Sequence, residues 1–333
     1  MIRFWLTMIG FVPLFLLSGS EKRPVPLAEV PSAPLEIEAR AVLNPIVVAQ
    51  SPFHFVKAWT LSSPNRDFGS VSAMMRDSIG FTTISDHGAV VRFKMTADGN
   101  VFDASTSPLP RGCALDELKT SRDAESVSRD PRTRDVLIGF EWTNAICRAD
   151  ARLARAVRRT SPPAMRSWPI LGGAEALVTL RDGRTLVFAE QRGGGGATSP
   201  LLIFDRDPTL AKARATALSY RPPAGFRPTD AAQLPDGRIV IVNRRYEFPL
   251  NFSAVITITD LPDFTPGAVV TGKIVVRLED PSIADNYEAI AVSQNGARTF
   301  VWLMSDDNFI AYQSTYLVLL EVQDANARPA KSN

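Results

Sequence analysis

Residues 287–322 read YEAIAVSQNGARTFVWLMSDDNFIAYQSTYLVLLEV, and this stretch shows the unit from which the chain is built. An alternating apolar segment leads to Asn295-Gly296, a pair that supplies the left-handed backbone of a tight hairpin. A more apolar segment, 299–304, ends on the polar run 306–308, and a third alternating segment follows. The pattern predicts three antiparallel strands. The polar run is either a turn between strands or the rim of a cation site.

Four earlier stretches share this plan, with RDGR and PDGR as the clearest of their turns. The small or acidic residues that open the five copies are separated by 55, 50, 55 and 58 positions. A period near 50 with about four short strands per unit is typical of a β-propeller, whose sheets bury their faces by stacking around one axis. The opening residues are Ser70, Glu125, Glu175, Asp230 and Glu288.

The repeats predict an all-β protein that folds as a β-propeller with five blades. Too little chain follows residue 322 to complete the last sheet. We therefore expect FHFVKAWTLSS, residues 53–63, to pair with the last blade and close the ring, which removes exposed sheet edges. A six-bladed ring that uses residues 35–48 is the alternative. KIVVRLE, at 273–279, is a candidate fourth strand of one blade.

The first 20 residues have the build of a secretory signal peptide. Arg3 precedes an apolar stretch at 4–17, and small residues follow it. A membrane anchor is the alternative, but the stretch is short for a spanning helix and contains Pro13. We expect a periplasmic or secreted protein with no stable membrane span after cleavage. Its parts are then an extended tail at 21–34, one propeller domain at 35–324 and a disordered tail at 325–333.

The net charge limits the classes of partner, and the two cysteines raise the question of a disulfide. The 37 basic and 35 acidic residues give a net charge of +2, which supplies no electrostatic reason to bind nucleic acid or an anionic membrane. We expect a monomer. Cys113 and Cys147 are either one disulfide, as export permits, or two unpaired thiols. With His54 and His87 as the only histidines, the chain offers little for a zinc site.

Acidic side chains recur at equivalent places in the copies. Equivalent strand ends of a propeller lie at one height, and a two-strand hairpin returns the chain to its starting level. The starts of the first strands should therefore join the ends of the second strands on one rim. The second-strand ends carry Asp86, Glu141, Glu190, Asn243, Arg244 and Asp306, and the first-strand starts carry Glu125, Glu175, Asp230 and Glu288.

This arrangement predicts a ring of carboxylates around a pore mouth. Their mutual repulsion raises pKa values unless a cation neutralises them, and Arg244 and Arg245 can do part of this. Ca²⁺ can do more, since carboxylate and amide oxygens are its preferred ligands. The alternative is that each acid caps a strand end and faces water.

Five stretches of the chain form a further pattern: FGSVSAM from Phe68, SDHG from Ser85, DAESV from Asp123, DNYEAIAV from Asp285, and SDDNF from Ser305 followed by STYLVLL. With these stretches the chain resembles the phytase-like propeller family, whose bacterial members are described by an esterase-like activity of phytase. The resemblance covers about residues 40 to 322, and its last motif is the most specific. Ser70 stands where the family pattern has a second glycine, and Ala289 where glycine is frequent.

The resemblance implies an exported, calcium-dependent hydrolase of ester or phosphoester bonds. Acids hold Ca²⁺, arginines hold phosphate oxygens of a small-molecule ligand, and a bound water attacks. The implied roles are catalysis by Glu125, Glu288, Asp306 and His87, substrate binding by Arg244 and Arg245, and metal binding by Asp86, Glu141, Glu175, Glu190, Asp230 and Asp307.

Four alternatives stay open at this point. The chain lacks a G-x-S-x-G nucleophile elbow, and a Ser-His-Asp triad would have to use His87, beside Asp86, as its base. The competing interpretation of His87 is a rim histidine fixed by hydrogen bonds. A non-catalytic propeller that binds a ligand or partner protein in the periplasm, and a purely structural cation site, are the alternatives to a hydrolase.

Overall fold

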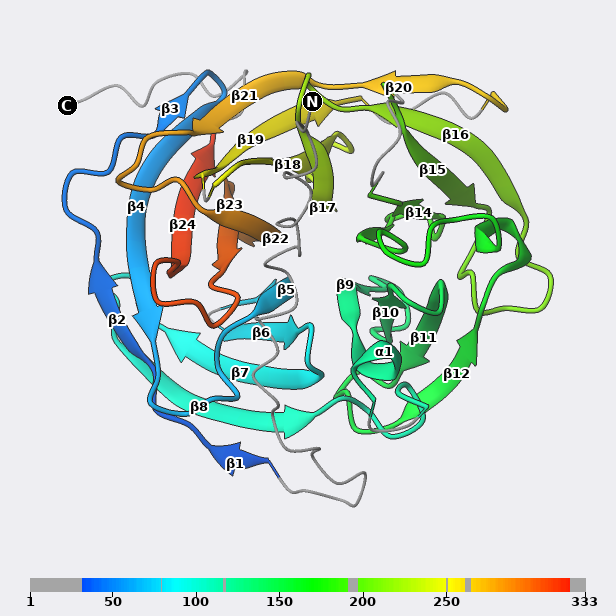
Figure 1. Cartoon of the computed structure of the whole chain (residues 1–333), viewed down its shortest axis with the longest axis horizontal. Helices are drawn as coiled ribbons and strands as arrows, with labels where there is room; N and C mark the ends of the chain where they lie inside the picture. The colour runs from blue at the N-terminus through cyan, green and yellow to red at the C-terminus, as the bar shows by residue number, and fades with distance from the viewer. Residues whose placement is uncertain are drawn as a thin grey trace, which may run out of the picture.

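The computed structural model describes residues 32–78, 80–115, 118–190, 197–249, 251–260 and 265–323. Five β-sheets stand in a ring around one axis, which confirms the predicted five-bladed propeller (Figure 1). We number the sheets as blades in chain order. Blade 1 is β1-β8-β7-β6-β5, blade 2 is β12-β11-β10-β9, blade 3 is β13-β14-β15-β16-β20, blade 4 is β17-β18-β19-β21-β3, and blade 5 is β2-β4-β24-β23-β22.

The four main strands of each blade form an antiparallel meander from the ring axis outward, and the edge strand β20 of blade 3 pairs parallel with β16. The innermost strands are β5 (Val71–Asp77), β9 (Ala124–Arg129), β13 (Ala176–Thr179), β17 (Arg227–Gln233) and β22 (Asn286–Asn295). The second strands are β6 (Gly80–Ser85), β10 (Val136–Phe140), β14 (Thr185–Phe188), β18 (Ile239–Glu247) and β23 (Arg298–Asp306). The third strands are β7 (Ala89–Met95), β11 (Ala145–Ala149), β15 (Ser199–Phe204), β19 (Asn251–Thr259) and β24 (Thr315–Val322).

The outer strands complete the blades. They are β8 (Val101–Pro108), β12 (Ala156–Thr160), β16 (Ala215–Arg221), β21 (Lys273–Leu278) and β4 (Phe53–Ser62). Short edge strands β1 (Ala33–Pro34), β20 (Val269–Thr271), β3 (Val48–Ala49) and β2 (Glu38–Ala41) extend four of the sheets. Two short helices, α1 (Lys119–Arg122) and a 3-10 turn at Pro163–Met165, lie in connections.

Glycine turns fix the hairpins at the ends of the inner strands. Gly183, Gly237 and Gly296 all have positive φ, at 92°, 97° and 59°. L-residues rarely adopt that conformation, so Asp-Gly and Asn-Gly pairs mark these turns in the sequence. The hairpins bring each second strand back to the level at which its inner strand began.

The ring closes through the N-terminal part of the chain. Strand β4 pairs antiparallel with β24, from Thr315 opposite Leu61 to Val322 opposite Phe53, as the sequence predicted. The segment at 35–48 does not build a sixth blade. It supplies β2 to the edge of blade 5 and leads into β3 at the edge of blade 4. Strand β21 confirms the fourth strand expected at 273–279.

The apolar core lies between neighbouring blades. Val240 and Val242 of blade 4 share one buried cluster with Val318 and Leu320 of blade 5. Equivalent clusters fill the other interfaces, as where Ile84 of blade 1 meets blade 2. Burial of a Val, Leu or Ile side chain contributes about 1.5–3 kcal/mol. The blades therefore form one cooperative unit and hold the inner strand ends in fixed relation.

Cys113 and Cys147 form a disulfide with an S–S distance of 2.05 Å. The bridge ties the connection between β8 and β9 to the middle of β11. It resolves the choice between a bridge and two thiols, and it fits an oxidising compartment.

We expect Cys147→Ser to lower the free energy of unfolding by about 3–4 kcal/mol, the loop-closure entropy of a 34-residue separation. Denaturant unfolding of the variant and of the oxidised and reduced wild type measures this. An equal stability of oxidised and reduced wild type would contradict it.

The expected signal peptide and the C-terminal tail lie outside the described residues. The expected N-terminal tail ends in a strand, because Ala33 and Pro34 pair with Thr106 and Ser105 of β8. In the part of the chain that is described, no helix has the length and apolar character needed to cross a membrane.

Candidate functional site

A β-bulge marks the start of the inner strand in four blades. One residue of the strand has no opposite partner there, and a bulge of this kind re-aims its side chain. The bulged residues are Ser72, Glu125, Thr229 and Glu288. Glu125 and Glu288 are therefore equivalent, whereas Ser70 and Asp230 lie two and one positions away from the matching residue in their blades.

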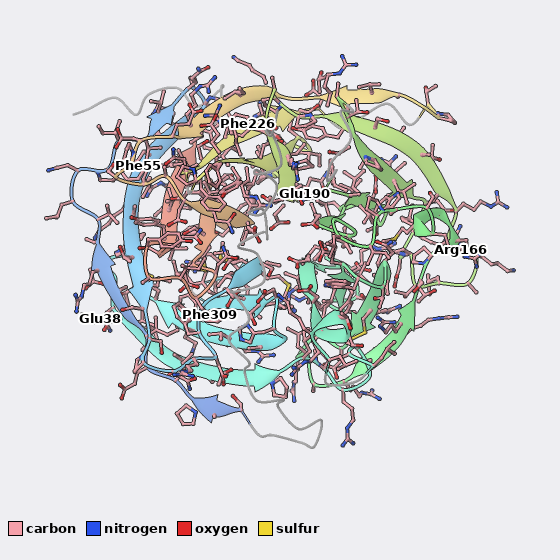
Figure 2. All side chains as sticks on the ribbon, in the orientation of Figure 1. Glu38, Phe55, Arg166, Glu190, Phe226 and Phe309 are labelled. Atoms are coloured by element: carbon pink, nitrogen blue, oxygen red, sulfur yellow. A yellow bond between two sulfur atoms is a disulfide. The ribbon has the colours of Figure 1, made fainter. Side chains whose placement is uncertain are left out.

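The second strands end at one level around the ring. The Glu141 backbone N–H donates to the Asp123 carbonyl, and the Asp86 backbone N–H donates to the Ser70 carbonyl. In blades 4 and 5 the matching residues are Arg244, opposite Arg227, and Asp306, opposite Asn286. Glu190 follows β14 by two residues, and Figure 2 labels it close to the centre of the ring. One end of the propeller thus carries four acids and one arginine on its second strands.

Three carboxyl groups of blade 2 form the most compact part of this end. Asp123, Glu125 and Glu141 each offer an oxygen, and these oxygens lie within 4.8 Å of one another. Asp123 and Glu141 are 3% exposed. Three oxygens at this spacing match the donor set of a hard divalent cation. We call these residues the acid cluster.

Hydrogen bonds orient two members of the acid cluster and leave one oxygen unused. The Trp142 indole N–H donates to Asp123 Oδ2 at 2.5 Å, and the Gly172 N–H donates to Glu141 Oε1 at 2.6 Å. Asp123 Oδ1 is buried and finds no hydrogen-bond partner among the described residues. A buried carboxylate oxygen without a partner is costly, so this atom points to a ligand.

Burial and mutual repulsion control the protonation of the acid cluster. Burial raises the pKa of Asp123 to about 7. The charge of Lys119 opposes this shift, and the charges of Asp86 and Glu141 add to it. Burial also raises the pKa of Glu125 well above its usual range, and Asp123 and Glu175 add to the effect. A bound cation would remove this repulsion.

The raised pKa of Asp123 predicts a stability that falls with pH. Between pH 4 and 7 the folded protein keeps a proton that the unfolded chain has lost, so the free energy of unfolding of the calcium-free protein decreases through this window. A shift from 3.8 to about 7 corresponds to on the order of 4 kcal/mol. Asp86 has a lowered pKa, so its contribution changes only below pH 4. Urea unfolding with chelator at pH 5 and 7.5 tests this, and greater stability at pH 7.5 would contradict it.

A lysine from the helix between blades 1 and 2 reaches the same rim. Lys119 Nζ lies 2.8 Å from Asp86 Oδ2, and His87 Nδ1 lies 3.3 Å from Asp86 Oδ1. Burial alone would raise the pKa of Asp86, but the hydrogen bond from His87 and the charge of Lys119 outweigh it and hold that pKa below its usual range. The Asp86 carboxylate is therefore fixed in its ionised form.

Ser85, His87 and Asp86 make a chain of contacts like that of a hydrolytic triad. Ser85 Oγ lies 3.2 Å from His87 Nε2. Ser85 is buried, however, and its hydroxyl accepts the Ala89 N–H at 3.0 Å and donates to the Ala89 carbonyl at 3.4 Å. A nucleophile must be accessible to its substrate, and this hydroxyl is used to close the turn between β6 and β7.

We expect Ser85→Ala to keep any ester or phosphate hydrolysis of the wild type, with the free energy of unfolding lowered by about 1 kcal/mol through the lost turn bonds. Steady-state rates and urea unfolding measure the two effects. A hundredfold loss of rate in a folded variant would establish a serine nucleophile instead.

Arg244 joins blades 3, 4 and 5 at the rim. Its Nη1 donates to Glu288 Oε1 and to Asn286 Oδ1, both at 2.7 Å, and its Nη2 donates to Glu190 Oε1 at 2.8 Å. Burial would lower the pKa of Arg244, but the charges of Glu288 and Glu190 outweigh it and raise that pKa. Arg244 therefore stays charged and neutralises the side of the mouth that faces the acid cluster.

Two of the predicted metal ligands, Asp230 and Asp307, instead accept hydrogen bonds from backbone N–H groups. Both oxygens of Asp230 accept backbone N–H bonds, from Ala231 and from Ile290 of the next blade, each at 2.8 Å. Asp307 Oδ1 accepts the N–H groups of Ser70 and Phe309.

Asp306, by contrast, belongs to the rim. It accepts from the Asn308 N–H and the Asn286 side chain, and burial raises its pKa well above the usual range. The charges of Glu288 and Asp86 add to that shift.

Arg245 and Glu175 complete the predicted set. Arg245 extends from the mouth toward Ser253 and Glu279. Glu175 is buried, and its charge acts on the pKa values of both Glu125 and Arg244. Glu175 thus links the acid cluster to the Arg244 group.

Sequence reasoning did not assign Asp123, Trp142 or Lys119 to the site. Asp123 stands in the DAESV motif two residues before Glu125, and Trp142 directly follows Glu141, so both were within reach of the repeat. Lys119 lies in α1, in a connection that has no counterpart in the repeat.

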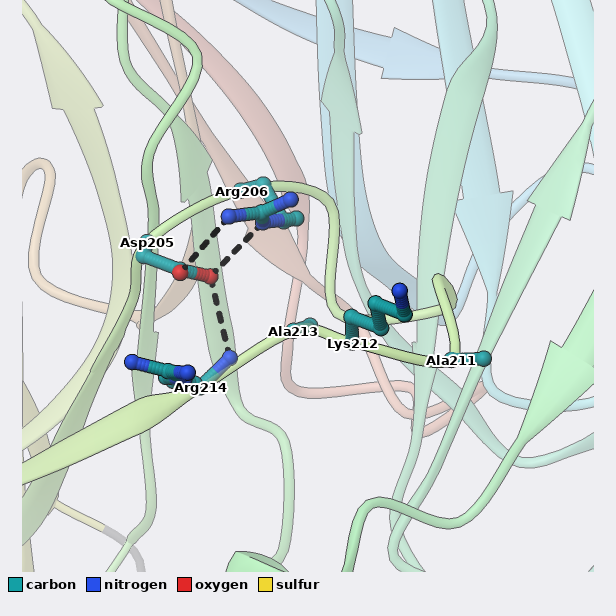
Figure 3. Close-up of a pocket in the computed structure, with 6 residues that line it drawn as sticks. All are labelled: Asp205, Arg206, Ala211, Lys212, Ala213 and Arg214. Carbon is teal, nitrogen blue, oxygen red and sulfur yellow. Dashed lines mark hydrogen bonds and ion pairs between the residues drawn. The ribbon is translucent and has the colours of Figure 1, made fainter.

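One further hollow lies on the outer part of blade 3. It encloses about 490 Å³ beside the connection between β15 and β16 (Figure 3). Asp205 there pairs with Arg206 at 3.0 Å and accepts the Arg214 N–H at 2.9 Å. These groups close the hairpin, and the hollow contains none of the rim acids.

Fold and site define a five-bladed propeller with an acidic mouth suited to a cation. The chain belongs to the phytase-like family, described as esterase-like activity of phytase, whose model matches residues 66–309. No curated protein matches this chain.

The solved structures that match this chain have low sequence identity to it and TM-scores below 0.5. A thermostable family-43 glycoside hydrolase has 9% identity and a TM-score of 0.46, over 80% of this chain and 96% of its own. A protein of unknown function from Dyadobacter fermentans has 10% and 0.43, over 82% and 100%. The Malassezia sympodialis allergen Mala s 1 has 13% and 0.41, over 90% and 100%. These values are too low to carry an argument about function.

Proposed function

We propose that the protein is an exported, calcium-dependent hydrolase of phosphate or carboxylate esters, with its reaction centre at the acidic mouth. The observation that carries the proposal is the acid cluster, in which three oxygens lie within 4.8 Å and the buried Asp123 Oδ1 has no hydrogen-bond partner among the described residues. Membership of the phytase-like family supports the reaction class. The disulfide supports export.

The donor set of the acid cluster fits Ca²⁺. Asp123, Glu125 and Glu141 would hold the ion, and their all-oxygen character suits a hard cation. When bound, Ca²⁺ supplies positive charge that polarises an ester or phosphoryl oxygen. The same charge makes the mouth able to accept an anionic substrate, which the carboxylates alone would repel.

The chain's own cations would orient the substrate. Lys119 Nζ contacts Asp86 but its side chain is 62% exposed, so its other N–H groups face solvent at the rim. Arg244 stands across the mouth with its charge shared between Glu190 and Glu288. Lys119 beside the acid cluster and Arg244 across the mouth can bind phosphate oxygens and limit how the ester lies.

Glu288 and Asp306 would handle protons. Burial raises the pKa of both. The charge of Arg244 opposes the shift of Glu288, and the charges of Glu190 and Glu288, respectively, add to the two shifts. A carboxyl whose pKa approaches the working pH can accept a proton from an attacking water and return it to the leaving group. Glu288 has the same bulge position in blade 5 as Glu125 has in blade 2, and its charge acts on the pKa of Glu125.

The test uses the purified mature protein with p-nitrophenyl phosphate, p-nitrophenyl acetate and phytate, in excess calcium or in chelator. We expect turnover of at least one substrate that requires calcium and is lost in Asp123→Asn. Asp236→Asn, which changes an acid of the β17–β18 turn paired with Arg238, is the matched control and should keep full activity.

Each other outcome assigns a different function. Activity that persists in chelator, or in Asp123→Asn, rejects the calcium centre. Calcium binding without turnover of any substrate identifies a non-catalytic propeller that binds a ligand or partner at this mouth. A calcium effect on melting temperature alone identifies a structural cation site.

A further inference from the structure

The end of the ring opposite the acidic mouth has a cavity lined mainly by positively charged side chains. All five inner strands start at the acidic mouth, so their last residues lie together at the second mouth. Glu125 and Arg129 stand near the two ends of β9, about 14 Å apart at the usual rise of a strand. A cavity of about 270 Å³ opens at this second mouth and is lined by residues of all five inner strands.

Arginines dominate the polar lining of this cavity. Among its described lining residues four are arginines and one, Asp77, is acidic, which gives 4 − 1 = +3 in formal charge. Apolar surface is contributed by Ala232 and Val292, which line the cavity and are only partly buried. The arginines are Arg76, Arg129, Arg134 and Arg181.

Arg76 is held in place without using its hydrogen-bond donors. Its guanidinium carbon lies 4.1 Å from the centre of the Phe81 ring and 4.2 Å from that of Trp302. Its Nε and Nη1 atoms are buried and have no hydrogen-bond acceptor among the described residues. Burial lowers the pKa of Arg76 to about 10, so it is charged at neutral pH. A buried cationic donor without an acceptor is costly and indicates a missing anionic partner.

Arg129 is a second cation of the lining, and the nearby positive charge of Arg134 repels it. Its Nη1 donates to the backbone carbonyls of Arg134 and Ala151, which fixes the side chain. Burial lowers the pKa of Arg129, and the neighbouring charge of Arg134 lowers it further. Asp77 acts in the opposite direction but is exposed to solvent. Like charges held this closely favour an anion between them.

We propose that the second mouth binds a small organic anion, with its apolar body against Ala232 and Val292 and its carboxylate or phosphate group on Arg76, Arg129 and Arg134. Guanidinium groups match the planar fork of a carboxylate and the oxygens of a phosphate. The cavity volume of about 270 Å³ suits a ligand of roughly the size of a substituted benzene ring. This site is separate from the acidic mouth and does not depend on any hydrolytic activity.

Calorimetric titration of the full-length mature protein tests the site. Chelator is present throughout, so that the acidic mouth holds no calcium and repels anions. The probes are benzoate and phenyl phosphate, which distinguish the two head groups, benzyl alcohol as the neutral analogue, and inorganic phosphate as the head group alone. We expect at least one of the two aromatic anions to bind, at least tenfold more tightly than benzyl alcohol, as expected from the loss of a charged hydrogen bond.

Variants localise the binding. Arg134→Gln changes an exposed side chain, and Arg76→Met keeps a long side chain between the Phe81 and Trp302 rings. Each substitution should lower the affinity for the anion at least tenfold. Arg238→Gln, in the β17–β18 turn and outside the cavity lining, should leave affinity unchanged. Equal binding of benzyl alcohol, unchanged binding in both cavity variants, or an equal loss in Arg238→Gln would overturn the site. Inorganic phosphate that binds as tightly as phenyl phosphate would overturn the apolar part of the proposal.

Discussion

Glu125→Gln is expected to abolish calcium binding and, at the same time, to make the calcium-free protein more stable. The substitution keeps the size of the side chain and removes its charge. Because burial and the charges of Asp123 and Glu175 raise the pKa of Glu125 well above its usual range, the ionised form is disfavoured in the fold. Removing it should raise the free energy of unfolding in chelator at pH 7.5 by about 1–2 kcal/mol.

The effect on calcium is expected to be larger. Glu125 offers one of three oxygens that lie within 4.8 Å, and an amide oxygen is a neutral replacement. Loss of an outer partner of a metal ligand already costs about ten- to hundredfold in affinity, so loss of a ligand charge should exceed that. Calorimetric titration with calcium and urea unfolding in chelator measure the two effects.

A matched control separates this from a general effect of removing an acid. Glu321→Gln changes an acid of β24 that pairs with Arg298 at the protein surface. It should leave calcium binding unchanged and alter the free energy of unfolding by no more than about 1 kcal/mol. A Glu125→Gln protein that is less stable than wild type in chelator would show that the acid cluster is not under repulsive strain.

Turn chemistry explains why the blades could be predicted. Gly183, Gly237 and Gly296 adopt positive φ, and that requirement leaves Asp-Gly and Asn-Gly pairs at a regular spacing in the sequence. Ring closure was predicted because the last copy of the repeat supplies only three strands, β22, β23 and β24. The level of the second-strand ends followed from the same hairpins, which is why Glu141, Glu190 and Arg244 could be placed on one rim.

Register is the part that the sequence could not supply. A β-bulge adds one residue to a strand and leaves no compositional mark, so Asp230 was aligned with Glu125 although the bulge makes Thr229 the equivalent residue. Side chains alternate between the two faces of a strand, and a shift of one position therefore sends Asp230 to the backbone of the next blade. Lys119 was not predicted as a site residue for a different reason, because its position depends on a connection outside the repeat.

The Arg244→Gln substitution should produce the largest loss of stability at the acidic mouth. Arg244 contacts Glu190, which is 1% exposed, and Glu288, and both carboxylates lose their closest cation when it is replaced. Breaking a buried ion pair by removing one partner costs about 3–5 kcal/mol, because the remaining charge is buried without compensation. Arg227 is 3.8 Å from Glu190 and 45% exposed, so it can replace only part of the interaction.

Two further measurements identify uncompensated charge as the cause. Adding Glu190→Gln to the variant should recover more than half of the lost free energy of unfolding, and lowering the pH from 7.5 to 5 should recover part of it as the carboxyls take up protons. Arg245→Gln changes the adjacent residue, whose partners Glu247 and Glu279 are at the surface, and should cost about 1 kcal/mol or less. If the double variant is no more stable than Arg244→Gln, the arginine stabilises the protein through packing. The folded state then does not need a cation beside the carboxylates of this mouth.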